Sequence, residues 1–76
     1  MGKSEEEMVY NYIRGVLKAF LEGKQHFNWV FTNIIDSHSR LRDHELKQIF
    51  EDLKDYGDPE LYRQIHAACR EQGWLE

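Results

Sequence analysis

The sequence contains a single cysteine, Cys69, and a lone thiol cannot form an internal disulfide. The fold must therefore be held by a hydrophobic core, and a reducing compartment is the expected setting. The N-terminus, Met1 to Glu7, is acidic where a signal peptide would be basic, and no apolar run approaches the roughly 20 residues that cross a bilayer. These absences predict a cytoplasmic protein without a membrane partner.

Positive charge is also scarce. The sequence contains ten basic and fourteen acidic residues, which gives a formal net charge of −4. The basic residues are spread along the chain and do not form a cluster. Binding to nucleic acid depends on a dense cationic surface that neutralises phosphates. The sequence therefore predicts no nucleic-acid partner, and it has no glycine-rich loop of the kind that binds phosphates.

The chain of 76 residues has room for one core, which excludes a second domain or a pair of lobes enclosing a substrate. Hydrophobic residues make up 41% and charged residues 32% of the sequence, a balance typical of a folded globular protein. A small single domain is expected.

Apolar residues recur at steps of three and four in four segments, the pattern of helices that each bury one stripe. The sequence predicts helices near residues 4–22, 26–36, 43–56 and 59–72. The expected buried stripes are Val9, Tyr12, Ile13, Val16, Leu17 and Phe20; Phe27, Val30, Phe31, Ile34 and Ile35; Leu46, Ile49, Phe50 and Leu53; and Leu61, Tyr62, Ile65, Ala68 and Cys69. No strand-length segment alternates with period two. The predicted fold is all-α: a small four-helix bundle formed by residues 1–72 as a single domain.

Helix boundaries are marked by residues that satisfy free backbone groups. Ser4 with Glu7 forms an S-x-x-E capping box, and Asp43 is placed to cap the third helix. Gly57 is expected to end that helix. The strongest boundary is Asp58-Pro59, an N-cap aspartate followed by proline at the first helical position. Because the connections are short, neighbouring helices are expected to run antiparallel.

The last four residues, Gly73-Trp74-Leu75-Glu76, resemble a cloning remnant, with a spacer, a tryptophan useful for absorbance and a Leu-Glu pair that often precedes a tag. These ends make the chain similar to an engineered or computationally designed or redesigned helical protein, and no natural family is recognised in its motifs. The resemblance implies that residues 73–76 stand outside the fold. Cys69 and the mid-helix Gly15 favour a redesigned natural scaffold over a wholly new one.

Trp29 is the most informative candidate for a binding site. On a helical wheel it lies nearly opposite the apolar stripe of its own helix, and Thr32, Asn33 and Asp36 surround it at helical spacing. A rigid aromatic ringed by polar groups has the composition of an interface hot spot. The alternative is that helix four or the N-terminal segment covers Trp29 and makes it part of a second core face.

Tyr10 and Arg14 are secondary candidates for the same partner-binding site, since tyrosine and arginine are enriched at protein interfaces. Their role depends on Tyr10 sharing a surface with Trp29. The alternative is an ordinary solvated helix edge.

The sequence predicts no metal, no cofactor and no catalytic residue. His44-Glu45 resembles the start of a zinc-protease helix, but position 48 is glutamine where the second histidine is needed. His66 and Cys69 are the one conceivable base and nucleophile pair, and a cysteine on an apolar stripe should have a raised, unreactive thiol pKa.

The sequence is therefore interpreted as a non-enzymatic protein-protein interaction module that binds another protein through the outer face of helix two. Two alternatives remain. The chain is a purely structural or self-associating helical domain without a ligand, or it is a small enzyme that uses Cys69 and His66.

Overall fold

The computed structural model of the chain describes residues 5–41 and 44–75. These residues form four α-helices and one short 3-10 helix, with no strand in either range. The elements are α1 (Glu5–Leu21), α2 (Phe27–Ser37), the 3-10 helix η1 (His38–Arg40), α3 (Glu45–Asp52) and α4 (Pro59–Glu71). The predicted all-α fold of a small four-helix domain is confirmed.

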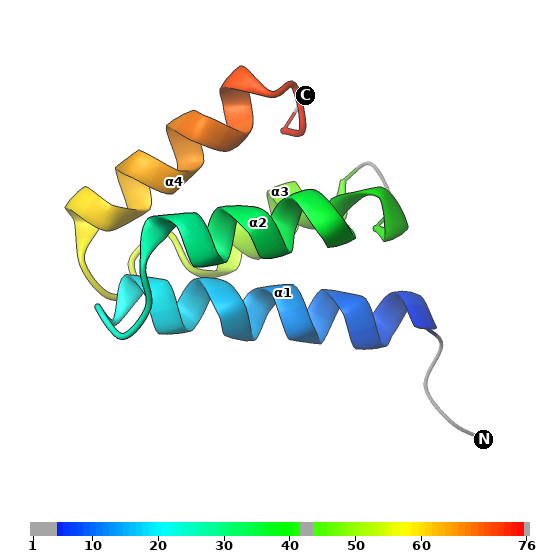
Figure 1. The fold of residues 1–76 in the computed structure, drawn as a ribbon, viewed down its shortest axis with the longest axis horizontal. Coiled ribbons are helices and arrows are strands. Elements are labelled where there is room, and N and C mark those ends of the chain that lie inside the picture. The colour runs from blue at the N-terminus through cyan, green and yellow to red at the C-terminus, as the bar shows by residue number, and fades with distance from the viewer. Residues whose placement is uncertain (1–4, 42–43, 76) are drawn as a thin grey trace.

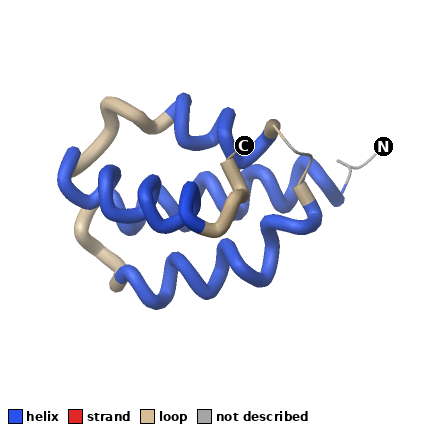
Figure 2. The backbone as a smooth tube through the Cα atoms, turned by 90° about the horizontal axis from the view of Figure 1, so that it is seen from above, coloured by secondary structure: helices blue, strands red, loops and turns tan. Residues whose placement is uncertain are grey.

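The longest helix, α1, packs against each of the other three α-helices (Figure 1). Helix α4 runs obliquely over the others, and seen from above α2 and α3 lie on opposite sides of it (Figure 2). This arrangement gives α1 one flank facing α2 and another facing α3. Residues on the two flanks of α1 therefore belong to different surfaces.

One hydrophobic core joins all four helices. Its buried residues are Ile13, Val16, Leu17, Phe20, Leu21, Val30, Ile34, Leu41, Leu46, Ile49, Phe50, Leu53, Ile65, Cys69 and Leu75. Most of them belong to the stripes expected from the 3.6-residue period, which shows that this period correctly orients each helix.

Two residues that were predicted to be buried are exposed. Tyr12 is 52% exposed and Ile35 is 46% exposed. Consecutive helical residues are separated by about 100° around the axis, so Ile35 lies well away from the buried Ile34. Only a narrow stripe of α2 is covered, and Val30 and Ile34 are its buried residues.

Helix α3 ends earlier than predicted, at Asp52. The backbone turns there, with the Leu53 amide donating to Ile49 and Phe50 and the Tyr56 amide donating to Leu53. Gly57 lies beyond this turn at φ +68°. It is thus a loop residue and does not end the helix as predicted, because the chain must first turn toward α1.

That loop docks on the end of α1. The Asp58 amide donates a 3.0 Å hydrogen bond to the Leu21 carbonyl oxygen, and a Cβ atom at Gly57 would lie 2.5 Å from the same oxygen. Glycine is therefore required at position 57 both for its positive φ and for its close approach to Leu21.

The predicted start of α4 is confirmed. Asp58 Oδ1 accepts a 2.8 Å hydrogen bond from the Glu60 amide, and Pro59 occupies the first turn. The proposed caps at Ser4 and Asp43 lie outside the described residues.

The expectation that residues 73–76 stand outside the fold is wrong for Trp74 and Leu75. Leu75 is only 8% exposed and belongs to the core. The Trp74 ring stacks on Phe31 and on His38, with centroid distances of 5.5 Å and 4.3 Å. The chain turns back after α4 at Gly73, where φ is +80°, and this reversal brings both apolar side chains onto the helices.

Candidate functional site

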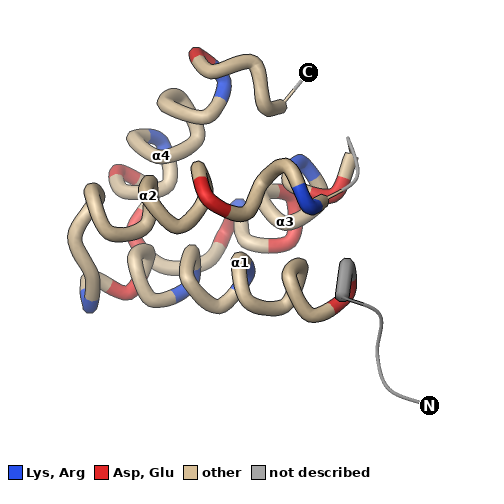
Figure 3. The backbone as a smooth tube through the Cα atoms, turned by 45° about the vertical axis from the view of Figure 1, so that its right-hand side comes forward, with Lys and Arg blue, Asp and Glu red and all other residues tan. Residues whose placement is uncertain are grey.

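Helix α2 is amphipathic but carries almost no charge. Its sequence, FNWVFTNIIDS, contains one charged residue, Asp36, which marks the single acidic turn along this helix (Figure 3). A solvent-facing helix normally presents several charged side chains on its outer face. The outer face of α2 is therefore unusual in being polar or apolar and nearly uncharged.

Trp29 lies on this outer face with 40% of its surface exposed. This confirms the position given by the helical wheel, on which Trp29 lies nearly opposite the apolar stripe of its helix. The alternative, in which helix four or the N-terminal segment covers Trp29 and makes it part of a second core face, is not met among the described residues: the aromatic side chains of α2 that pack against the core are Phe27 and Phe31.

A hydrogen-bonded connection fixes the position of Trp29 relative to α1. The Tyr12 hydroxyl donates to Asn33 Oδ1 at 2.6 Å, and Asn33 Nδ2 donates to the Trp29 carbonyl oxygen at 2.8 Å. Asn33, expected to be a rim residue, thus joins two helices and is half-buried. Thr32 and Asp36 are exposed beside Trp29, as expected.

A groove lies between α1 and the end of α2. It has a volume of about 390 Å³ and is lined by Met8, Val9, Tyr12, Ser37 and Arg40. Met8 and Tyr12 are two of four large apolar side chains that are exposed in the described part of the chain, and the others are Trp29 and Ile35. All four belong to α1 and α2.

Sequence reasoning missed Met8 and misplaced Tyr12. A tyrosine at the border of an apolar stripe needs a hydrogen-bond partner for its hydroxyl. This requirement could have predicted that Tyr12 lies at the edge of the core, next to a polar residue of another helix. Met8 offered no comparable signal, because its exposure depends on how far α2 extends along α1.

Tyr10 and Arg14 are not brought together with Trp29. Tyr10 faces α3 and its hydroxyl donates to Asp52 Oδ2 at 3.0 Å. Burial and the hydrogen bond to Asp52 raise the pKa of Tyr10, while the Arg14 charge opposes this shift. The two residues therefore share a surface with α3, on the other flank of α1.

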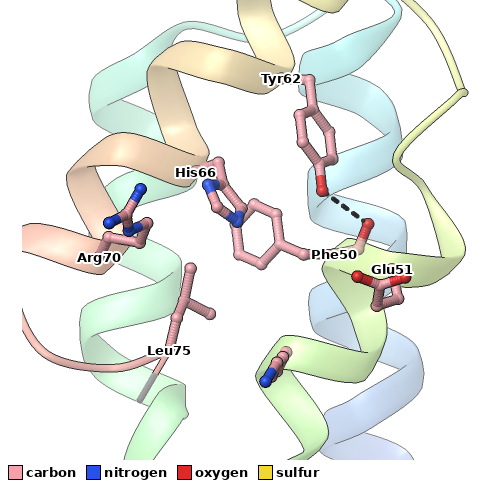
Figure 4. A pocket seen from close by; sticks show the side chains of 7 residues that line it. Phe50, Glu51, Tyr62, His66, Arg70 and Leu75 are labelled. Atoms are coloured by element: carbon pink, nitrogen blue, oxygen red, sulfur yellow. Dashed lines mark hydrogen bonds between the residues drawn. The ribbon is translucent and has the colours of Figure 1, made fainter.

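A second candidate site is a cavity of about 220 Å³ between α3 and α4. Its residues are Lys47, Phe50, Glu51, Tyr62, His66, Arg70 and Leu75 (Figure 4). The Tyr62 hydroxyl donates to the Phe50 carbonyl oxygen at 3.0 Å. Burial, and to a lesser degree Arg70, lowers the pKa of His66, and Glu51 partly opposes them.

The thiol of Cys69 is fully buried, and burial raises its pKa to about 12. This agrees with the raised pKa expected from the apolar stripe. A thiol in this state is almost wholly protonated at neutral pH and is a poor nucleophile. Among the described residues, no group of three or more His, Cys, Asp or Glu side chains is placed to hold a metal ion, and His44 is exposed.

Within the described residues, none of the helices combines the length and the apolar character that a bilayer crossing requires. Comparisons with protein-family models, with curated proteins and with solved structures found no match. Similarity to another protein therefore supplies neither a family nor a function, and any functional proposal depends on the surfaces described above.

Proposed function

We propose that this chain is a non-enzymatic protein-protein interaction module that binds a partner protein through the outer face of α2, with Trp29 at its centre. The observation that carries this proposal is the exposed indole on a nearly uncharged helix face. Tryptophan is usually largely buried, and it is among the residues most enriched at interface hot spots.

The residues around Trp29 suit the surroundings of a hot spot. Thr32 and Asp36 are exposed on the same helix and form a polar rim that excludes water from the indole once a partner is bound. Asn33 is engaged with Tyr12 and with the Trp29 carbonyl oxygen. This engagement holds the backbone at Trp29 in place before binding, which lowers the entropy cost of association.

The partner is expected to present an apolar pocket for the indole and a basic residue opposite Asp36, the one charge on α2. Met8 and Tyr12 of α1 extend the apolar area next to Asn33. Tyr10 and Arg14 belong to the α3 flank and are left out of the proposed contact.

The proposed setting is the cytoplasm, with no nucleic-acid partner. A lone buried thiol needs no oxidising compartment. The excess of acidic over basic residues disfavours phosphate binding. The buried Cys69 is the main argument for a non-enzymatic role.

The test is a selection of binders from a displayed library of helical peptides, followed by affinity measurements on variants. Trp29→Ala should weaken the selected binders by about 2 kcal/mol or more. It should lower the free energy of unfolding by about 2 kcal/mol, which is less than the loss of about 3–5 kcal/mol for a fully buried tryptophan, because 40% of the Trp29 surface is exposed. Tyr10→Phe, on the α3 flank, is the matched control and should leave binding unchanged. Binders that tolerate Trp29→Ala, or a large loss of stability in that variant, would contradict the proposal.

The second candidate function is self-association through the same residues. It is favoured by the location of Met8, Tyr12, Trp29 and Ile35 on only two helices, since a self-complementary patch is what a two-fold dimer requires. Sedimentation equilibrium over a range of concentrations separates the two candidates. A mass that falls on dilution, and a Trp29→Ala variant that stays monomeric, would support self-association in place of a separate partner.

A further inference from the structure

The cavity between α3 and α4 has features of a small-molecule site and is separate from the outer face of α2. Its inner wall is a cluster of three rings. Phe50 meets Tyr62 and His66 edge to face at centroid distances of 5.8 Å and 5.2 Å, and Tyr62 stacks on His66 at 5.5 Å. Leu75 closes another side, so the inner wall is formed by rings and one aliphatic side chain, while Lys47, Glu51 and Arg70 make the rest of the lining polar (Figure 4).

The mouth of this cavity is positively charged. Lys47 of α3 and Arg70 of α4 line it together with Glu51. Among the described residues neither cation has an ion-pair partner, whereas Glu51 pairs with Lys54 at 3.9 Å. A positive mouth is unexpected in a chain whose net charge is −4.

The pKa of His66 is consistent with a positive charge at the mouth of the cavity. Arg70 lowers the pKa of His66 more than Glu51 raises it, although burial is the largest cause of the shift. The potential that these two charges create at the ring is therefore positive.

From this geometry we propose that the α3–α4 cavity binds a small carboxylate with an aromatic body. The body would lie against Phe50, Tyr62, His66 and Leu75, and the carboxylate would lie at the mouth between Lys47 and Arg70. The size is suitable, because about 150 Å³ of apolar cavity accommodates benzene and this cavity offers about 220 Å³. Arginine is the side chain best matched to a carboxylate, since its guanidinium donates two parallel hydrogen bonds.

The probe is benzoate, titrated into the full chain and followed by NMR. Benzamide, which keeps the ring without the charge, and acetate, which keeps the charge without the ring, are the comparison ligands. Benzoate should bind at least about tenfold more tightly than either one, because each lacks one half of the interaction. Equal affinity for benzamide would overturn the carboxylate part of the proposal, and equal affinity for acetate would overturn the aromatic part.

Two substitutions locate the site. Arg70→Gln and Lys47→Gln should each weaken benzoate by about tenfold, the expected effect of losing one charge-assisted hydrogen bond. Both side chains are exposed, so the fold should be retained. Arg63→Gln is the matched control, since Arg63 lies on α4 and pairs with Glu60 away from the cavity. Wild-type affinity in the Arg70→Gln variant would overturn the proposal.

His66 supplies a readout inside the cavity. The groups that face it are Arg70 and Tyr62 on α4 and Lys47 and Glu51 on α3. A bound carboxylate adds a negative charge next to the ring and should raise the pKa of His66. Benzamide, which covers the imidazole without adding a charge, should not raise that pKa. A His66 titration that is unaltered in saturating benzoate would show that the ligand lies elsewhere.

Discussion

The Tyr12 hydroxyl lies 2.6 Å from Asn33 Oδ1, and this hydrogen bond joins α1 to α2, the helix that carries Trp29. Asn33 continues the connection to the Trp29 carbonyl oxygen at 2.8 Å. The sequence predicted separate roles for these residues: Tyr12 in a buried stripe, Asn33 in a polar rim and Trp29 as a hot spot. In the structure, hydrogen bonds connect all three.

Removing either partner of this hydrogen bond should destabilise the fold modestly. Tyr12→Phe and Asn33→Ala are each expected to lower the free energy of unfolding by about 0.5–1.5 kcal/mol, the usual net contribution of one hydrogen bond. The two losses should not add in the double variant, because each substitution breaks the same interaction. Urea unfolding of the four proteins measures this coupling. Strictly additive losses would show that the interaction contributes nothing, and Asn28→Ala, at an exposed position of α2, is the control.

Gly57→Ala should be more damaging than Gly23→Ala. Both glycines have positive φ, +68° and +79°, so both variants incur the conformational cost of about 1–2 kcal/mol. A Cβ atom at Gly57 would also meet Leu21 at 2.5 Å, while one at Gly23 would have nothing within 4 Å. The clash should add about 1–3 kcal/mol. Equal unfolding free energies for the two variants would mean that the loop does not dock closely on α1.

The stability of the protein should fall as the pH decreases below 6.5, in part because of His66. Burial and Arg70 lower the folded-state pKa of His66 below its usual 6.5, so the unfolded chain takes up this proton at higher pH than the folded protein. The contribution of His66 is complete above pH 6.5 and is lost as the pH falls through 6.5 to the lowered folded value.

His66→Gln should therefore flatten the pH dependence of the unfolding free energy in that range. Thermal or urea unfolding at a series of pH values measures the slope. The exposed Gln64 provides a control on the same helix, and Gln64→Ala should keep the wild-type slope because it removes no titratable group. An unchanged slope in His66→Gln would contradict the assigned role of burial.

Cys69 should react with a thiol reagent only when the fold opens. Its side chain is fully buried and burial raises its pKa to about 12, so both access and the thiolate fraction are low at neutral pH. Labelling by iodoacetamide should be slow in the native protein and rapid in denaturant. Rapid labelling under native conditions would instead support the alternative in which the chain is a small enzyme that uses Cys69 and His66.

The helices and their buried faces were largely predictable because the 3.6-residue period is a local property of the chain. The end of α3 was not, since it depends on the docking of Gly57 against Leu21, a contact between segments far apart in the sequence. The cap of Asp58 on Glu60 was predictable because it is formed within three consecutive residues.

The candidate sites divide in the same way. The outward direction of Trp29 followed from its angular position on one helix. That Tyr12 lies next to Asn33 could be predicted only with knowledge of the register of α1 against α2. The α3–α4 cavity is formed by residues that lie far apart in the sequence, from Lys47 to Leu75, and that meet only in the folded chain. Periodicity gives neither helix register nor crossing angle, so these features became visible only in the structure.

The C-terminal tail, Trp74 and Leu75, should contribute to the stability of the fold. Leu75 is almost fully buried, and Leu75→Ala should lower the free energy of unfolding by about 2 kcal/mol, the lower end of the range for a buried leucine. Trp74→Ala should remove the stacking on Phe31 and His38 and cost about 1 kcal/mol or more.

Gln72→Ala is the control for these two variants, because Gln72 is exposed in the same segment and its replacement should change stability by no more than about 0.5 kcal/mol. A chain truncated after Gly73 should lose at least as much stability as Leu75→Ala alone, since it removes Leu75 from the core and also removes the stacking of Trp74 on Phe31 and His38. Unfolding free energies that match between the truncated and full chains would show that the tail is an appendage. A loss of the predicted size would mean that whatever the origin of these residues, the core is completed only when the chain folds back after α4.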